Sequence, residues 1–132
     1  MTWIKCVAKL FLRRRLLLVR VSGSSMEPTY TSGDIVVCEL RPIVRTLMVG
    51  DVVILSTPSD RGTLSIKRLA GTPGDSVGEA TSRQVLRAGQ FWVLGDNPRI
   101  VGDSRRFGAY LAEHIVARAI HPRPKSAGAI QP

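Results

Sequence analysis

Cysteines, aromatic residues and acidic residues are all scarce in this chain of 132 residues. The two cysteines, Cys6 and Cys38, show no metal-type or redox-type spacing, so we expect packed thiols rather than a disulfide. Aromatic residues make up 5% of the sequence, which leaves few stacking platforms for single-stranded nucleic acid. With 10 acidic against 19 basic residues, the net charge of +9 suits acidic partners such as phosphate backbones or anionic lipid headgroups. Charge alone does not choose between these partners.

The chain also lacks a long apolar run. The segment Trp3–Leu12 is apolar but carries Lys5 and Lys9, ends at Arg13–Arg15, and is shorter than the roughly 20 residues of a membrane span. The basic cluster stands where a secretory peptide would have its small-residue cleavage site. We therefore expect a short amphipathic helix in residues 1–15, which either lies on an anionic membrane surface or packs on its own domain. The predicted localisation is membrane-associated without a full transmembrane span, with a cytoplasmic alternative.

The rest of the sequence is typical of a mainly β protein. Segments rich in Val, Ile and Leu alternate with Gly-Asp, Pro-Ser and Pro-Gly turns. The length allows one domain, which we place at residues 16–120, followed by a flexible tail at 121–132 that holds three prolines. The predicted strands are Leu16–Val21, Asp34–Leu40, Asp51–Ser56, Thr63–Leu69, Gln90–Leu94 and His114–Ile120, with a hairpin loop at Thr57–Gly62 and a polar excursion at Gly78–Ala88.

The first stretch that could carry chemistry is Ser22–Thr29, where a predicted strand ends in a turn that contains glycine. Gly23 lets the backbone approach a ligand closely, while Pro28 stiffens the exit. Ser25 could therefore present its hydroxyl together with its own amide, aimed at an incoming carbonyl oxygen. Composition alone favours an ordinary serine-rich loop.

The second stretch, Ser65–Asp75, places Lys67 in an apolar strand before a Pro-Gly turn. Burial disfavours a charged amine, and lowering its pKa from about 10.4 to near 7.5 costs about 4 kcal/mol, which a folded core can supply. A strand lysine by itself is more often a surface residue with a buried stem. Serine needs a base, and neither histidine, His114 or His121, stands in a nucleophile-like context, so we favour a Ser-Lys dyad over a Ser-His-Asp triad.

The third stretch, Gly95–Gly108, is a long turn-rich connection whose charges alternate in sign. Asp103 can pair with Arg105 and so fix the loop. The carboxylates of Asp96 and Asp103 lack the spacing of a hand-type calcium site, so we expect no metal and no other cofactor.

These three stretches, in this order, resemble the sequence boxes of type I signal peptidases, over most of the chain from residue 22 to 119. The resemblance implies a single domain of coiled antiparallel sheets in which Ser25 is the nucleophile and Lys67 the general base. It also implies that Met26 borders the substrate pocket and that Asp103 with Arg105 braces the site. The implied partner is a client polypeptide whose N-terminal extension has small residues before the cut. The matching boxes are Gly23-x-Ser25-Met26-x-Pro28-Thr29, Gly33-Asp34-Ile35-Val36, Lys67-Arg68-x-x-Gly71-x-Pro73-Gly74-Asp75, and Gly95-Asp96-Asn97 with Gly102-Asp103-Ser104-Arg105 and Gly108.

The sequence departs from the family pattern at two positions. Many bacterial members hold the oxyanion with a serine hydroxyl where this chain has Gly23, so here backbone amides must form the oxyanion hole. Many members orient the lysine with a serine where this chain has Val101, so Lys67 must be oriented by water or by a main-chain carbonyl.

The short length, the absent anchor and the Gly-Asp-Asn-Pro form of residues 95–98 most resemble the small branch of nickel-type superoxide dismutase maturation proteases. Such a protease trims an N-terminal extension from its client and itself holds no metal. The main alternative is a general signal peptidase I acting on exported preproteins. Self-cleaving SOS repressors share the Ser-Lys chemistry, but residues 1–21 are too few for their helix-turn-helix. A basic nucleic-acid-binding β module and an inactive membrane-surface protein remain as other classes, although we expect no nucleic-acid partner.

Overall fold

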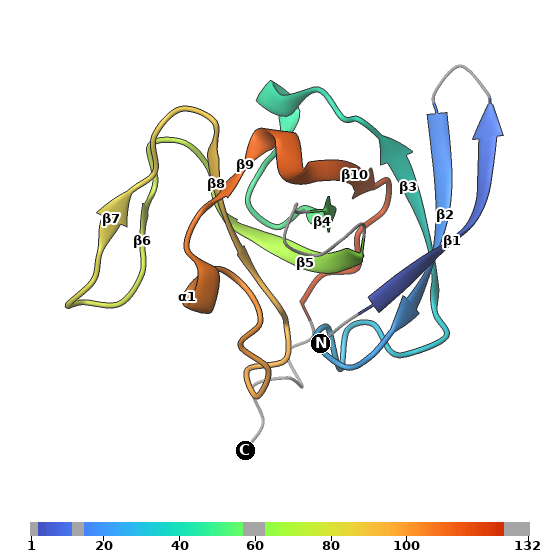
Figure 1. Ribbon diagram of the computed structural model, residues 1–132, viewed down its shortest axis with the longest axis horizontal. Coiled ribbons are helices and arrows are strands. Elements are labelled where there is room, and N and C mark those ends of the chain that lie inside the picture. Colours follow the sequence, from blue (N-terminus) through green and yellow to red (C-terminus); the bar gives the residue numbers. More distant parts are fainter. Residues whose placement is uncertain (1–2, 12–14, 57–62, 126–132) are drawn as a thin grey trace.

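The computed structural model describes residues 3–11, 15–56 and 63–125 of the chain. Eight strands form one antiparallel sheet in the order β1-β2-β3-β10-β4-β5-β8-β9, and β6 and β7 form a separate two-stranded hairpin at its flank (Figure 1). The strands are β1 (Trp3–Phe11), β2 (Arg15–Ser22), β3 (Ile35–Leu40), β4 (Val52–Ser56), β5 (Leu64–Gly71), β6 (Ser76–Val77), β7 (Gln84–Val85), β8 (Gln90–Leu94), β9 (Tyr110–Leu111) and β10 (Ile115–Ala119). Short helical turns are η1 (Val44–Thr46), α1 (Ser104–Phe107) and η3 (Ala112–His114).

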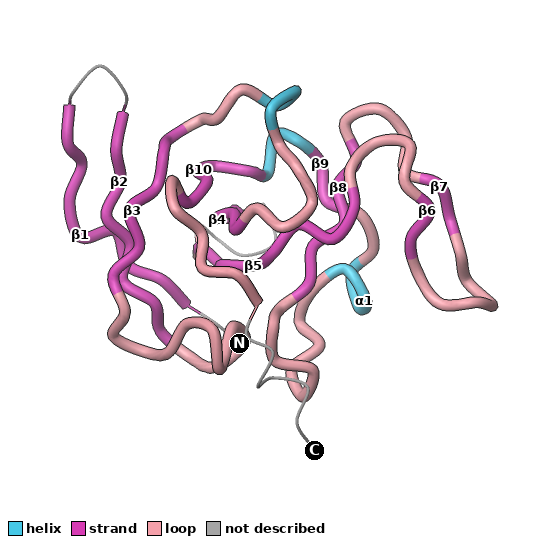
Figure 2. The backbone as a smooth tube through the Cα atoms, turned by 180° about the vertical axis from the view of Figure 1, so that it is seen from behind, coloured by secondary structure: helices cyan, strands magenta, loops and turns pink. Residues whose placement is uncertain are grey.

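The sheet curls so that β1, at its edge, also pairs with β5. β1 pairs with β2 along most of its length, and its residue Ile4 also pairs with Leu64 of β5. The strands β1, β2, β3, β10, β4 and β5 therefore form a ring, which both views show from opposite sides (Figures 1 and 2). The mainly β, single-domain prediction is confirmed.

The predicted N-terminal helix is wrong, because residues Trp3–Phe11 form strand β1. An isolated helix shorter than about 12 residues is marginal in water. Pairing with β2 satisfies the backbone groups of both segments and covers an edge that would otherwise stay open. The first segment thus belongs to the same sheet as the predicted catalytic domain.

Six strands lie where the alternation of apolar residues and turns predicted them, with bounds that differ by at most two residues: β2, β3, β4, β5, β8 and β10. The predicted hairpin loop at Thr57–Gly62 lies outside the described residues. The polar excursion at Gly78–Ala88 contains β7, which folds back on β6.

The inside of the ring is a core to which alternate residues of its strands contribute. Val19, Val36, Ile54, Ile66 and Ala117 come from five different strands and are at most 5% exposed. The thiol of Cys38 is buried among them and free, which confirms the prediction for that cysteine.

The first residues of the predicted flexible tail are tied to the domain. The Arg123 amide donates to the Tyr30 hydroxyl at 2.7 Å, and its guanidinium donates to the Asp34 carboxylate at 2.9 Å. The guanidinium carbon also lies 5.0 Å from the centroid of the Tyr30 ring. These contacts place Arg123 against the loop between β2 and β3, the flexible tail stays a prediction, and residues 126–132 lie outside the described part.

Candidate active site

The structure brings Ser25 and Lys67 together from segments 42 positions apart. The Lys67 Nζ donates a hydrogen bond of 2.9 Å to the Ser25 Oγ, and the two residues are only 3% and 0% exposed. Ser25 stands in the turn that follows β2, where Gly23 has a φ of 91°, a backbone conformation that favours glycine. Lys67 lies in the middle of β5.

Burial lowers the pKa of Lys67 to about 8, because the charged amine loses its hydration. The nearby carboxylate of Asp103 opposes this shift, while the positive charge of Arg105 adds to it. At pH 7, roughly a tenth of the amine is therefore neutral and able to accept a proton from a hydroxyl within hydrogen-bonding distance.

Asp103 and Arg105 form the pairing that the sequence predicted. Asp103 is fully buried and accepts hydrogen bonds from the Gly95 amide at 2.9 Å and from the Arg105 guanidinium at 2.6 Å. Burial raises the pKa of Asp103, but the hydrogen bonds from Arg105 and Gly95 outweigh it, so the net shift is downward. Asp103 also caps α1 by accepting from the Arg105 amide. The pair thus ties the turn after β8 to α1.

The turn at Gly95–Asn97 rests directly on the backbone of the serine. The Asn97 amide donates to the Ser25 carbonyl at 2.9 Å, and the Asn97 side chain donates to the Ser24 carbonyl at 2.9 Å. A Cβ at Gly95 would stand 2.6 Å from the Ser25 carbonyl oxygen, so only glycine fits there. The contacts of Gly95 and Asn97 are not predictable from local sequence, although both residues belong to the Gly-Asp-Asn box.

The other predicted site residues lie at different depths. Met26 is fully buried in the core inside the ring, and its sulfur accepts from the Asp96 amide at 3.4 Å, so its role as a pocket wall stays a prediction. Val101 is 49% exposed. His114 lies in η3, where its Nδ1 accepts from the Leu111 amide, and His121 is exposed.

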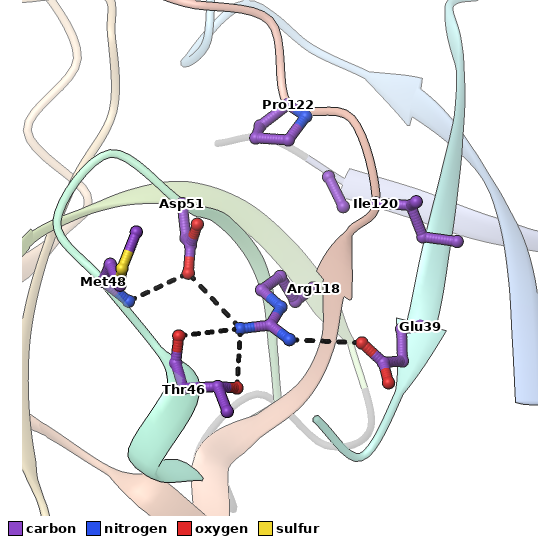
Figure 3. Close-up of a pocket in the computed structure, with 8 residues that line it drawn as sticks. Glu39, Thr46, Met48, Asp51, Arg118, Ile120 and Pro122 are labelled. Carbon is purple, nitrogen blue, oxygen red and sulfur yellow. Dashed lines mark hydrogen bonds and ion pairs between the residues drawn. The ribbon is translucent and has the colours of Figure 1, made fainter. Parts of the chain in front are cut away.

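A separate polar pocket of about 210 Å³ surrounds Arg118 (Figure 3). The guanidinium donates to the Thr46 hydroxyl at 2.9 Å and to the Glu39 carboxylate at 3.2 Å, and it lies 3.6 Å from the Asp51 carboxylate. The polar groups that line this pocket form hydrogen bonds and ion pairs with one another. These interactions join β10 to β3 and to the loop before β4. This arrangement indicates a structural network rather than a second reactive site.

Comparison with known proteins supports the same family as the sequence boxes. The family model "Signal peptidase, peptidase S26" matches residues 2–85, a range that contains Ser25 and Lys67. The mitochondrial inner membrane protease subunit 1 of Mus musculus is 37% identical over 98 residues, which cover 69% of this chain and 59% of the relative. The subunit 1 protein of Schizosaccharomyces pombe is 34% identical over 106 residues, covering 75% and 68%. The subunit 2 protein of Mus musculus is 33% identical over 125 residues, covering 87% and 71%.

These relatives do not support the predicted nickel-type superoxide dismutase branch. The chain spans about 59% of the length of the mouse subunit 1 protein. Within the described residues, none of the helices has the length and apolar character that crossing a membrane requires. The match of the family model to more than half of the chain, together with these relatives, shows that the chain belongs to the signal peptidase family, peptidase S26.

Proposed function

We propose that the chain is a serine endopeptidase that removes an N-terminal extension from precursor polypeptides, with Ser25 as nucleophile and Lys67 as general base. The observation that carries this proposal is the buried 2.9 Å hydrogen bond between Lys67 Nζ and Ser25 Oγ, at a lysine whose pKa is lowered to about 8. Lysine activates serine only as the neutral amine, and the lowered pKa makes that form far more abundant than it is in a solvated lysine.

In the proposed mechanism, neutral Lys67 takes the hydroxyl proton as the Ser25 Oγ attacks the scissile carbonyl carbon. Backbone amides in the turn of Gly23 and Ser25 stabilise the oxyanion. The protonated amine then gives its proton to the leaving nitrogen, and an ester remains on Ser25. A water molecule, deprotonated by Lys67, hydrolyses this ester and regenerates the dyad.

The free edge of β5 supports an extended peptide as substrate. In the described part of the chain, no strand pairs with residues 65–67 on the side of β5 away from β4, because β1 pairs only at Leu64 and the pairing with β8 begins at Arg68. A peptide added there as a strand would run past Lys67 and place alternate side chains toward the dyad. Ser25 is fully buried, so the entering peptide has to displace part of what covers it.

The relatives' names favour a protease at a membrane over a protease that matures a nickel enzyme. They are called mitochondrial inner membrane proteases, which fits the alternative of a general peptidase that acts on exported preproteins. By the family resemblance, the client should carry small residues before the cut. Membrane association without a full span is the localisation that we propose for the described part of the chain.

The test is cleavage of a peptide with alanine at the two recognition positions before the scissile bond. We expect Ser25→Ala and Lys67→Ala each to abolish cleavage, with the double variant no worse than either, because the two groups act as one unit. His114→Ala and His121→Ala should keep near-normal rates. The rate of the unmodified protein should rise with pH through a midpoint near 8. Retained activity in either dyad variant, or a midpoint near 6.5 that disappears in His114→Ala, would overturn the proposal.

A further inference from the structure

A single residue, Asn97, holds both of the peptide units that flank Ser25. Its amide donates to the Ser25 carbonyl and its side-chain Nδ2 donates to the Ser24 carbonyl, each at 2.9 Å. The Ser24 carbonyl also accepts from the Glu27 amide at 3.1 Å. The Asn97 side chain is fixed in turn, because its Oδ1 accepts from the Arg99 amide at 3.1 Å. The nitrogen of this side chain, and not its oxygen, therefore faces Ser24.

The hydrogen bonds to the Ser24 carbonyl set the direction of the Ser25 N–H. A peptide unit is planar, and in the trans form its C=O and N–H point in opposite directions. The unit that joins Ser24 to Ser25 is trans. Holding the Ser24 oxygen therefore turns the Ser25 N–H to the side away from the Asn97 side chain. The bond from the Asn97 amide to the Ser25 carbonyl fixes the next peptide unit in the same way.

This direction matters for the oxyanion. In the proposed mechanism, negative charge develops on the oxygen of the carbonyl that Ser25 attacks. Gly23 has no side chain that could donate a hydrogen bond to this oxygen, so the orientation of the backbone donors decides how well the charge is stabilised. A carbonyl that accepts hydrogen bonds also polarises the N–H of its own peptide unit, which strengthens that N–H as a donor.

We propose that Asn97 is a positioning residue whose side chain orients the Ser25 N–H toward the oxyanion, an inference that rests on the proposed function. Asn97 should act on the oxyanion and not on the base. The pKa of Lys67 is set by its burial and by the charges of Asp103 and Arg105, whereas the Asn97 side chain is neutral. Loss of this side chain should therefore slow cleavage without moving the pH at which Lys67 loses its proton.

The first experiment measures kcat, KM and the pH profile with the alanine-containing peptide. Asn97→Ala should lower kcat about 10- to 100-fold, because one oxyanion donor is misdirected, while KM stays within about twofold and the pH midpoint stays near 8. Asn97→Asp keeps the size of the side chain and the bond from the Arg99 amide but cannot donate to the Ser24 carbonyl. At the pH plateau, its kcat should fall at least as far.

The matched control is Gln90→Ala, which also removes a side-chain amide from a turn. The Gln90 Oε1 accepts from the Arg87 amide at 2.8 Å in the turn before β8. This variant should keep near-normal kcat. Near-normal kcat in both Asn97 variants, or a pH midpoint that moves in Asn97→Ala, would overturn the positioning role.

The second experiment compares the binding of a peptide aldehyde with that of the matching peptide alcohol. The Ser25 Oγ adds to the aldehyde carbon, Lys67 takes the hydroxyl proton, and the aldehyde oxygen becomes the oxyanion. The alcohol has no carbonyl to attack. Asn97→Ala should weaken aldehyde binding by the same factor as kcat and leave alcohol binding unchanged.

Equal weakening of both ligands would indicate general damage to the substrate site and overturn the inference. If the unmodified protein cleaves no peptide, the proposed function fails, while the comparison of aldehyde with alcohol still decides the role of Asn97. An aldehyde that does not bind the unmodified protein would overturn that role as well.

Discussion

Lys67 and Arg68 are neighbours on β5, but only Arg68 forms an ion pair with a carboxylate, whereas Lys67 contacts a neutral hydroxyl. Arg68, with 12% of its side chain exposed, binds both carboxylate oxygens of Asp96 at 3.0 and 2.9 Å. It also donates to the carbonyls of Gly50 and Arg123. Lys67 leaves the strand on the other face and donates to the neutral hydroxyl of Ser25.

The difference between the two residues lies in the partners that the fold gives them. Arg68 is almost as buried as Lys67 but has an ion-pair partner, whereas the carboxylate beside Lys67, that of Asp103, is already held by Arg105. Arg105 thereby weakens the one attraction that would keep the lysine protonated. On one strand, Arg68 thus has a structural ion pair with Asp96, while Lys67 has no such pair within the described residues and its pKa is lowered.

Breaking the ion pair between Arg68 and Asp96 should have the largest effect on stability. Arg68→Met leaves the carboxylate of Asp96 buried without its counter-charge and should lower the free energy of unfolding by about 3–5 kcal/mol. Urea denaturation measures this loss. The control is Arg118→Met, whose partners Glu39 and Asp51 are 23% and 18% exposed, with an expected loss of about 1 kcal/mol (Figure 3). Equal losses of unfolding free energy in the two variants would show that the Arg68–Asp96 pair contributes no more to stability than the more exposed pairs of Arg118.

The lowered pKa of Lys67 should appear in the pH dependence of the free energy of unfolding. Because the pKa of Lys67 falls from 10.5 to about 8 on folding, the unfolded chain binds more protons between these values, and stability should rise with pH in that window. The expected rise is at most about 3 kcal/mol. Lys67→Met should lack this rise and, at pH 7, be inactive but more stable than the unmodified protein. Parallel stability curves for the two proteins would contradict the lowered pKa.

The smallest effect is expected at Val101, where many signal peptidases have a serine. Because its side chain is 49% exposed while Lys67 is 3% exposed, a hydroxyl in Val101→Ser should point largely to water. The rate should change by only a few tenths of a kcal/mol, and the pH midpoint should stay in place. A midpoint that moves by a full pH unit would show that residue 101 reaches the amine.

The sequence predicted the strands that have a local signature and the dyad that has an ordered motif. Alternating apolar residues bounded by glycine and proline turns located β2, β3, β4, β5, β8 and β10, and the spacing of the boxes singled out Ser25 and Lys67. The N-terminal strand was missed because its conformation depends on the open edge of β2, which no local pattern reveals. The tie of Arg123 to Tyr30 was missed for the same reason, since the hydrogen bond joins residues 93 positions apart.

The place of β10 in the ring bears on when this protein could become active. The last strand of the ring in the sequence, Ile115–Ala119, lies between β3 and β4 and pairs with both. Until residue 119 has left the ribosome, the ring lacks the strand between β3 and β4, and only the single pair between Ile4 of β1 and Leu64 connects the β1–β2 pair to the strand that carries Lys67. A growing chain has both reactive residues long before it has the ring that holds them together. Since non-local strand pairing forms slowly, we expect the hydrogen bond between Lys67 and Ser25 to become stable only after residue 119 has been synthesised.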